Sequence, residues 1–215
     1  MSVVNAARVS FGKKVDRMYT KPEDEKLIRY LAEHEHMSPF GHCFASFHVK
    51  APIFVARQLV KHKFLRWNEI SRRYVDKDTE YYLPKTWRGR AKDKKQGSEG
   101  VVDLSSILDT EHNTAILGSG TLQGHVIEIS EWLRETYKLL LDKGVCPEQA
   151  RMVLPQSTMT EWYWSGSLDA FADMCNLRCA FDTQPETRFV ATQISDRMRR
   201  LFPVSWAALV EKNYE

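Results

Sequence analysis

The chain has 215 residues and a mass of 25.0 kDa, enough for one domain, or at most two small ones, with a sizeable core. Hydrophobic residues make up 43% and charged residues 27%, which excludes the disordered and fibrous classes. The formal net charge is only +3, whereas proteins that bind nucleic acid over their whole surface are usually more basic. Any information about partners must therefore come from local features.

Targeting segments and cysteines give a consistent indication of the compartment. No apolar run approaches the roughly 20 residues that a membrane span needs, and the N-terminus does not resemble a secretory signal. Four cysteines do not make a disulfide framework, and the pair Cys175 and Cys179 has no second pair beside it to complete a zinc site. We therefore expect reduced thiols, no metal, no membrane association and a cytoplasmic location.

The first half of the chain alternates between expected strands and helices. Residues 3–10 are short, apolar and partly β-branched, which predicts a strand. Residues 22–35 follow a helical pattern that the segment 38–41 interrupts. Alternation of side chains over 43–50 predicts a second strand, and Pro52 then opens a helix expected to run from Ile53 to about Phe64. Residues 65–75 fit no single pattern.

Helices dominate the second half. Residues 84–100 have the composition of an exposed loop. A long amphipathic helix is expected from about Thr121 to Asp142, with an apolar stripe and Gly144 as its stop; the stripe consists of Leu122, Val126, Ile129, Leu133, Tyr137 and Leu140. Further helices are expected over 147–153, 168–181 and 186–201, the last ending before Pro203. Early strands and later helices indicate an α+β (mixed α/β) fold without repeats.

Charge is concentrated in residues 57–73. This segment holds six Arg or Lys side chains and one acid, Glu69, a local balance of +5. Cations next to hydroxyl, amide and aromatic groups suit a phosphorylated ligand that carries a ring, although a solvated helix face or a nucleic-acid patch remains an alternative. The spacing of Lys61 and Lys63, two residues apart, would let them serve two different anions.

Several familiar catalytic patterns are absent from the sequence. There is no G-x-G-x-x-G or Walker loop for a Rossmann or P-loop site. Ser71 lacks the G-x-S-x-G context of a hydrolytic serine, and the H-x-E and P-C-x-x-C pattern of zinc-dependent nucleotide deaminases is missing.

The basic segment resembles the signature of flavin-dependent thymidylate synthases. That signature reads Arg-His-Arg, seven residues, Ser, and here it is Lys61-His62-Lys63, seven residues, Ser71. The resemblance continues through the run 68–74, Asn-Glu-Ile-Ser-Arg-Arg-Tyr, and covers roughly residues 3–200. Other matching blocks are Ser38–Phe40, Phe47–Gln58, Ala150–Pro155, Asn176–Arg178 and Asp182–Glu186.

The resemblance implies an enzyme that methylates dUMP to dTMP. Methylenetetrahydrofolate would donate the carbon, FAD would carry the hydride and NADPH would reduce the flavin. It also implies a single domain over 1–215, with a central, mostly antiparallel sheet flanked by helices. The chain would form a homotetramer with active sites between subunits, and no protein nucleophile would be required.

Site residues follow from the resemblance position by position. Arg178 matches the arginine that favours ionisation at N3 of the uracil, and we expect it to be catalytic, because a guanidinium stabilises negative charge without titrating. The implied dUMP contacts are Gln58, Lys61, Glu69, Ser71, Arg72, Arg73, Arg151 and Arg178. The implied FAD contacts are Ser38, Lys61, His62, Lys63, Glu69 and, with weaker matching, Ser167, Leu168, Asp169 and Asp173. His36 and Tyr74 are candidates near the folate and flavin rings.

Alternatives stand beside these expectations. His36 could simply be a solvent-facing residue at a helix end, and Arg151 or Arg178 could form a structural ion pair. For the whole chain, the alternatives are a related flavin-dependent hydroxymethylase of pyrimidine nucleotides and, in a different class, a nucleic-acid-binding module that uses the 57–73 segment. The module would bind nucleic acid with strong salt dependence and would be colourless.

The two lysines of the triplet generate the first testable prediction. Lysine keeps the positive charge of the family's arginine but loses its planar fork, so bidentate contacts become single ones. We expect the purified chain to retain activity with an altered flavin affinity. Titration with FAD and a turnover assay check this, with the double variant Lys61→Arg/Lys63→Arg as comparison. A wild-type chain that neither binds FAD nor turns over, with both restored in the double variant, would contradict it.

Overall fold

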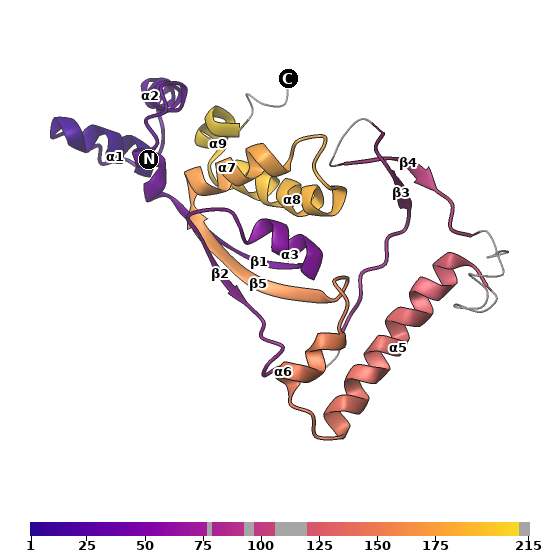
Figure 1. Ribbon diagram of the computed structural model, residues 1–215. Helices are drawn as coiled ribbons and strands as arrows, with labels where there is room; N and C mark the ends of the chain where they lie inside the picture. Colours follow the sequence, from indigo (N-terminus) through magenta and orange to yellow (C-terminus); the bar gives the residue numbers. More distant parts are fainter. Residues whose placement is uncertain (77–78, 93–96, 106–119, 211–215) are drawn as a thin grey trace. The chain divides into compact units, whose positions relative to one another are not determined.

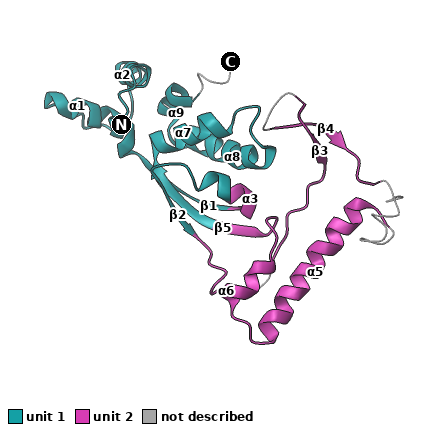
Figure 2. Cartoon of the chain, in the orientation of Figure 1, with its two compact units in different colours: residues 1–49, 57–68, 162–215 teal, residues 50–56, 69–161 magenta. Residues whose placement is uncertain are grey.

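The structure, a computed structural model, describes residues 1–76, 79–92, 97–105 and 120–210. The chain divides into two compact units (Figure 2). Unit 1 comprises Met1–Val49, Arg57–Asn68 and Trp162–Glu215, and unit 2 comprises Lys50–Ala56 and Glu69–Glu161. The expectation of a single domain over 1–215 stays a prediction.

Helices and strands are mixed along the chain (Figure 1). In chain order the elements are α1 (Ser2–Arg8), η1 (Val9–Phe11), α2 (Pro22–Glu33), η2 (Ser38–His42), β1 (Phe44–Pro52), α3 (Ile53–Leu59), β2 (Leu65–Glu69), β3 (Trp87–Arg90), β4 (Ser98–Val102), α5 (Leu122–Asp142), α6 (Pro147–Ala150), η3 (Arg151–Val153), β5 (Met159–Ser167), α7 (Leu168–Arg178), α8 (Pro185–Leu201) and α9 (Pro203–Val210). This arrangement confirms the predicted α+β fold class.

The larger sheet has the strand order β1-β5-β2. At one end of β5, the Leu168 N–H donates to the Cys43 carbonyl at 2.8 Å. At the other end, the N–H groups of Ile53 and Ile70 donate to Thr158 and Glu161, each at 2.9 Å. At the start of β2, Leu65 lies against Gly166, near the end of β5. Both outer strands therefore run antiparallel to β5, as the predicted mostly antiparallel sheet requires.

The side chains of β1 alternate as predicted. Phe44, Ser46, His48 and Lys50 are exposed, whereas residues 43–49 of the other set are buried or half-buried. On the inner face, α7 packs through Phe171, whose ring meets Phe47 at 5.1 Å and Trp164 at 5.6 Å, both edge to face. Helices α7, α8 and α9 pack against one another and complete the core of unit 1 (Figure 1).

The prediction of a strand over 3–10 is wrong, because these residues form α1 and η1. Val3 and Val4 are buried, and α1 packs against α2 and η2. Burying this apolar face outweighs the modest helix propensity of the β-branched valines.

Two further local predictions need correction. The helix that begins at Ile53 ends at Leu59 rather than near Phe64, because Phe64 adopts a φ of +63°, outside the helical region, and the chain continues into β2. The segment 84–100 is not simply a loop, since β3 and β4 pair antiparallel within and beyond it. Hydrogen bonds between the strands order this polar segment, in which periodicity gave no signal; residues 93–96 lie outside the described part of the chain.

The later helices are largely as predicted. Helix α5 begins after Thr121, whose hydroxyl accepts from the Gly124 N–H at 3.0 Å, and the left-handed Gly144 follows its end. Within its predicted stripe, Tyr137 is buried but Leu122 and Ile129 are exposed. The 168–181 helix stops three residues early. Helix α9 is not among the predicted helices, because Pro203 predicts the end of the preceding helix, whereas proline also suits the first turn of a new one. None of the helices in the described ranges has the length and apolar character to cross a membrane.

A buried carboxylate ties the N-terminal helices of unit 1 together. The Asp24 side chain is fully buried in the first turn of α2 and forms ion pairs with Arg8, at 2.8 Å, and with Arg17. It also accepts the Lys21 N–H at 2.9 Å. Burial would raise the pKa of Asp24, but the Lys21 N–H and the two guanidinium groups outweigh it, so that its pKa is lowered.

We predict that Asp24→Asn lowers the free energy of unfolding by about 2 to 3 kcal/mol at neutral pH, because it leaves two partly buried cations without their counter-charge. Because the pKa of Asp24 is lowered from its usual value of 3.8, the ionised carboxylate stabilises the fold at pH values above 3.8. This stabilisation is lost as the pH falls through the folded-state pKa. Urea unfolding at neutral and acidic pH measures both effects. Asp196→Asn, which removes the exposed ion pair with Arg199, is the matched control and should change stability by less than about 1 kcal/mol. Equal effects of the two variants would contradict the prediction.

Candidate functional site

The predicted site residues fall into both units. Unit 1 holds His36, Ser38, Gln58, Lys61, His62, Lys63, Ser167, Leu168, Asp169, Asp173 and Arg178. Unit 2 holds Glu69, Ser71, Arg72, Arg73, Tyr74 and Arg151. Within each unit, the geometry shows which of these side chains are held in place and by what.

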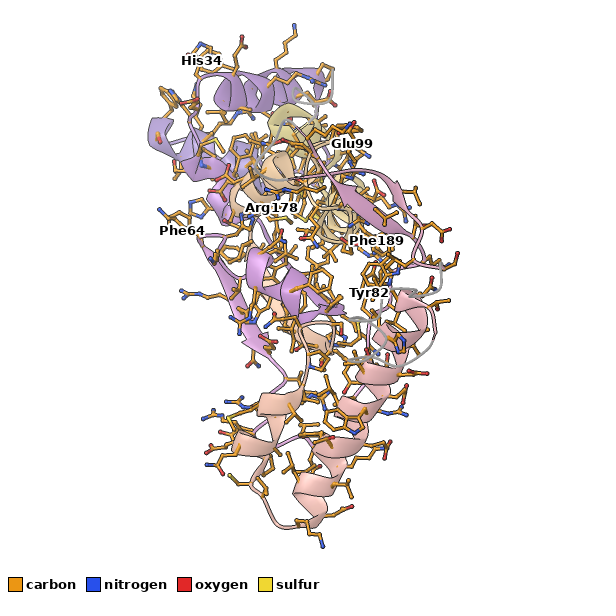
Figure 3. All side chains as sticks on the ribbon, turned by 45° about the vertical axis from the view of Figure 1, so that its right-hand side comes forward. His34, Phe64, Tyr82, Glu99, Arg178 and Phe189 are labelled. Carbon is orange, nitrogen blue, oxygen red and sulfur yellow. The ribbon has the colours of Figure 1, made fainter. Side chains whose placement is uncertain are left out.

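A hydrogen bond between Arg178 and His62 is the centre of the unit 1 group. Arg178 is the last residue of α7, and His62 lies in the turn after α3. The Arg178 Nε–H donates to His62 Nε2 at 3.0 Å. Figure 3 labels Arg178 within unit 1. The bond joins two of the predicted site residues, which are 116 positions apart in the sequence.

The contact fixes the charge state of the imidazole. Burial, and then the positive charge of Arg178, lower the pKa of His62 to about 4. The ring is therefore neutral at pH 7, and because Nε2 accepts a hydrogen bond, the ring proton is on Nδ1. The bond uses only Nε of the guanidinium, so its two terminal nitrogens keep their donors for other acceptors. The alternative of a structural ion pair does not apply to Arg178 within the described ranges, since its partner here is uncharged.

Gln58 is held by residues of α8 and the turn before it. Its side-chain amide donates to Gln184 Oε1, and its own carbonyl accepts from the hydroxyl of the fully buried Thr187 at 3.1 Å. The Gln184 amide in turn donates to Glu186 at 3.1 Å. The Gln58 carboxamide is thus fixed in orientation. The sequence does not predict Gln184 and Thr187 as site residues, although Gln184 lies in the matching block Asp182–Glu186, because their role depends on contact with Gln58 of α3.

Lys61 and Lys63 are exposed on either side of His62. Neither forms an ion pair with any residue that the structure describes. Because the ring between them is anchored by Arg178, their ammonium groups are two mobile positive charges on a fixed stretch of backbone. Such groups suit phosphate oxygens.

The start of α7 carries the second, weaker set of predicted flavin contacts. Ser167 is buried as the residue before the helix, and Leu168 is fully buried in the core. Asp169 has a buried carboxylate oxygen, Oδ1, without a hydrogen-bond partner among the described residues. Burial, followed by the negative charge of Asp169, raises the pKa of Asp173. These carboxylates are suited to accept N–H or O–H groups and are unsuited to phosphate.

These observations test whether the unit 1 residues fit a flavin dinucleotide. A cofactor of that class presents an anionic diphosphate, hydroxyl groups and flat rings with N–H donors. The exposed charges of Lys61 and Lys63 suit the diphosphate, and the unsatisfied oxygen of Asp169 suits a hydroxyl or N–H donor. The chemistry of these residues therefore fits the cofactor, and the lysines and the carboxylates suit different parts of it.

His36 and Ser38 are exposed near the end of α2. The ring of His36 lies edge-on to Tyr30 at 6.2 Å and to His34 at 6.4 Å, and Tyr30 and His34 stack at 4.0 Å. His36 is thus one of a group of rings exposed to solvent, rather than an isolated residue at a helix end. Its place beside a folate or flavin ring stays a prediction.

In unit 2, the signature segment folds into a compact turn. Ser71 Oγ accepts from the Arg73 N–H at 3.3 Å and from Arg73 Nε at 3.4 Å. The guanidinium of Arg73 lies 5.0 Å from the centre of the Tyr74 ring. Glu69, at the end of β2, accepts from the Thr160 hydroxyl at 2.6 Å. Hydroxyl, guanidinium and aromatic groups are therefore brought together locally by the turn itself.

Arg72 and Arg151 complete the unit 2 group. Arg72 is half-buried, and its positive charge acts on Tyr137, whose pKa burial nevertheless raises. Arg151 is exposed, and its Nε–H donates to the Glu148 carbonyl at 3.2 Å. Within the described ranges Arg151 forms no ion pair, so the structural alternative is not supported for it either.

The neutral state of His62 generates a stability prediction. Between pH 6.5 and about pH 4, the unfolded chain binds a proton at His62 that the folded chain does not bind. The free energy of unfolding therefore falls as the pH falls through this range, and above pH 6.5 His62 does not change it. In His62→Gln a carbonyl oxygen can still accept from Arg178 but cannot titrate. Urea unfolding at several pH values should show a smaller loss for this variant than for wild type. His42→Gln, at an exposed histidine, is the control, and parallel pH profiles for wild type and His62→Gln would refute the prediction.

Comparison with known proteins shows the family to which the chain belongs. The model of a family described as thymidylate synthase complementing protein matches residues 1–204. The flavin-dependent thymidylate synthase of Thermus thermophilus is 40% identical over 210 residues, which is 98% of this chain and 71% of that protein. That of Kosmotoga olearia is 39% identical over 214 residues, 99% of this chain and 86% of that protein.

A solved structure also matches. The UMP/dUMP methylase PolB from Streptomyces cacaoi, bound with 5-Br dUMP, gives a TM-score of 0.78 at 31% identity and covers 96% of this chain and 88% of its own. The same methylase bound with 5-Br UMP gives a TM-score of 0.75 at 30% identity, covering 96% of this chain and 86% of its own. With a family match over nearly the whole length, the chain belongs to the flavin-dependent thymidylate synthases.

Proposed function

We propose that this protein converts dUMP to dTMP, with methylenetetrahydrofolate as carbon donor, FAD as hydride carrier and NADPH as reductant of the flavin. The observation that carries the proposal is the Arg178–His62 hydrogen bond. It fixes a guanidinium through Nε with a neutral partner, so that the full positive charge and the terminal donors remain for a ligand. A pyrimidine that develops negative charge at N3 suits such a group.

The residues divide the work of binding dUMP by their chemistry. Arg178 would stabilise the negative charge that makes C5 of the uracil more nucleophilic, and it would do so without gaining or losing a proton. Gln58, whose carboxamide is locked by Gln184 and Thr187, would contact the base or sugar in one fixed orientation. The phosphate would be held by cations and a hydroxyl from the signature and from η3, namely Lys61, Ser71, Arg72, Arg73 and Arg151.

FAD, once reduced, supplies the hydride that completes the methyl group. In unit 1, Lys61 and Lys63 would hold its diphosphate and His62 would contribute a neutral ring with an Nδ1–H donor. Ser38, Ser167, Asp169 and Asp173 would accept or donate hydrogen bonds to its polar groups, and Leu168 would pack beneath them. Glu69 in unit 2 is proposed to contact both ligands, and His36 and Tyr74 to lie near the flavin and folate rings.

The homotetramer and the location are also part of the proposal. Helix α5 exposes four large apolar side chains on one helical face, Leu122, Ile129, Trp132 and Leu139. A second copy of the chain covering this face would remove them from water, which is consistent with active sites shared between subunits. The four cysteines are all free thiols, as expected for a protein of the reducing cytoplasm.

The alternatives are less well supported than methylation. The relatives compared above are named synthases, which favours methylation over hydroxymethylation and over a nucleic-acid-binding module. A broader choice of nucleotide has a specific observation behind it, since the similar solved structure is a methylase of both UMP and dUMP. We therefore propose UMP as a second candidate substrate.

The test is product analysis with the purified protein. We expect a yellow protein that NADPH bleaches, and that forms dTMP from dUMP and methylenetetrahydrofolate. Arg178→Ala should lower kcat about 100-fold, because it removes a group that stabilises the developing charge. Arg200→Ala, at an exposed arginine of α8 that no site residue touches, is the matched control.

The same assay separates the alternatives. Parallel reactions with UMP decide whether the 2′-hydroxyl is accepted, and mass spectrometry of the product distinguishes a methyl from a hydroxymethyl group. A colourless protein that cannot be reconstituted with FAD, or a kcat unaffected by Arg178→Ala, would overturn the proposed function.

A further inference from the structure

Phe64 combines a strained backbone with an exposed ring. Its φ of +63° lies in the left-handed region, and among the described residues other than glycine only Glu35 shares a positive φ. The Phe64 side chain is 83% exposed and lies at the outer edge of unit 1 in Figure 3. A left-handed conformation is costly for a bulky residue. An aromatic ring that stays in water also contributes no stabilisation, because its apolar surface is not buried. Neither property helps the fold.

The backbone of Phe64 lies close to the neighbouring strand β5. Gly166 of β5 lies directly against it: a Cβ atom at residue 166 would stand 3.0 Å from the Phe64 carbonyl oxygen and would collide with the Leu65 side chain. The absence of a side chain at Gly166 therefore allows the close approach. On the other side, His62 is anchored to Arg178 only two residues earlier.

This position links the two predicted flavin segments of unit 1. Phe64 directly follows Lys61-His62-Lys63, and its backbone packs against the residue that precedes Ser167 and the start of α7. The cations that suit a diphosphate and the carboxylate oxygen that suits a hydrogen-bond donor thus lie along the chain on either side of this contact. No ring of the described residues stacks on the Phe64 ring, which leaves both of its faces available.

We propose that Phe64 is a stacking contact for a flat heteroaromatic ring of the flavin cofactor, either the isoalloxazine or the adenine. This inference rests on the proposed function and adds to it a residue at one of the seven positions whose type the signature leaves open. Strained conformations persist where the surrounding structure enforces them, and they are frequent at ligand sites. The cost of the Phe64 conformation is then offset only when the ring covers the cofactor.

Three substitutions separate the ring from the strain. Phe64→Tyr keeps both, Phe64→Leu removes the flat ring and keeps the strain, and Phe64→Gly removes both. We expect Phe64→Leu and Phe64→Gly each to weaken FAD binding about tenfold, and Phe64→Tyr to stay within about twofold of wild type. Phe64→Gly should nevertheless raise the Tm of the flavin-free protein by about 2 to 4 °C, because the left-handed backbone suits glycine. A purely structural role would lower Tm and affinity together.

The probes identify the ring. Fluorescence titration with FAD, FMN and ADP shows whether the substitution weakens binding of the isoalloxazine part, through FMN, or of the adenine part, through ADP. Phe189→Leu, at an exposed phenylalanine of α8, is the control for loss of a surface ring and should leave all three affinities unchanged.

The remaining outcomes each overturn the inference. It is wrong if FAD affinity is the same in wild type, Phe64→Leu and Phe64→Gly. It is also wrong if dUMP affinity falls while FAD affinity does not, or if sedimentation shows that Phe64→Leu dissociates an oligomer without changing flavin affinity. A wild-type protein that binds no flavin would overturn both this inference and the proposed function, whereas one that binds FAD but forms no dTMP would overturn only the latter.

Discussion

The hydrogen bond from Arg178 to a neutral histidine is the interaction on which the proposed site depends. An arginine bound to a carboxylate loses most of its attraction for an anionic ligand, because the two charges cancel. His62 accepts the Nε–H without supplying a negative charge, and burial together with the guanidinium keeps the imidazole unprotonated. The hydrogen bond fixes the histidine tautomer, and the positive charge that helps to keep the ring neutral remains available to a nucleotide.

Unit 1 also contains arginines that are paired with a carboxylate and that stabilise the fold. Asp24 is fully buried between Arg8 and Arg17, and its single negative charge is shared by the two guanidinium groups. Gln58 follows the pattern of Arg178 instead, since its supports, Gln184 and Thr187, are neutral amide and hydroxyl groups. Arg8 and Arg17 thus share a carboxylate where they join the N-terminal segments, whereas the hydrogen-bond partner of Arg178 carries no charge.

What the sequence could predict follows the range of the interactions involved. Alternation over 43–50 and the helical spacing over 121–142 are local patterns, and the strand β1 and the helix α5 both appear in the structure. The strand expected over 3–10 failed because burial of Val3 and Val4 against other helices overrides local propensity. The pairing of β3 with β4 was missed for the related reason that it depends on a partner strand rather than on periodicity.

The same distinction between local and long-range interactions applies to the candidate site. The residue types of the signature were readable because they stand close together in the chain, and they resemble those of a known family. Two contacts could not be predicted from the sequence: the bond between Arg178 and His62, and the support of Gln58 by Gln184. Each joins residues more than 100 positions apart. The spacing of residues along the sequence does not predict that a histidine will be neutral. It also does not predict that a glycine on another strand will lie against the backbone of Phe64.

The lysines of the triplet take on a different meaning once this scaffold is known. The His62 ring is hydrogen-bonded to Arg178 and the Phe64 backbone lies against Gly166, so contacts on both sides of Lys63 restrain the backbone there. Adaptation to a ligand is then confined to the flexible ammonium groups of Lys61 and Lys63. A planar fork offers two donors in one fixed geometry, whereas an ammonium group on a mobile stem can follow a phosphate whose position varies. A rigid backbone that carries flexible point charges therefore retains the electrostatic attraction of the family's arginines and gives up only their directional contact.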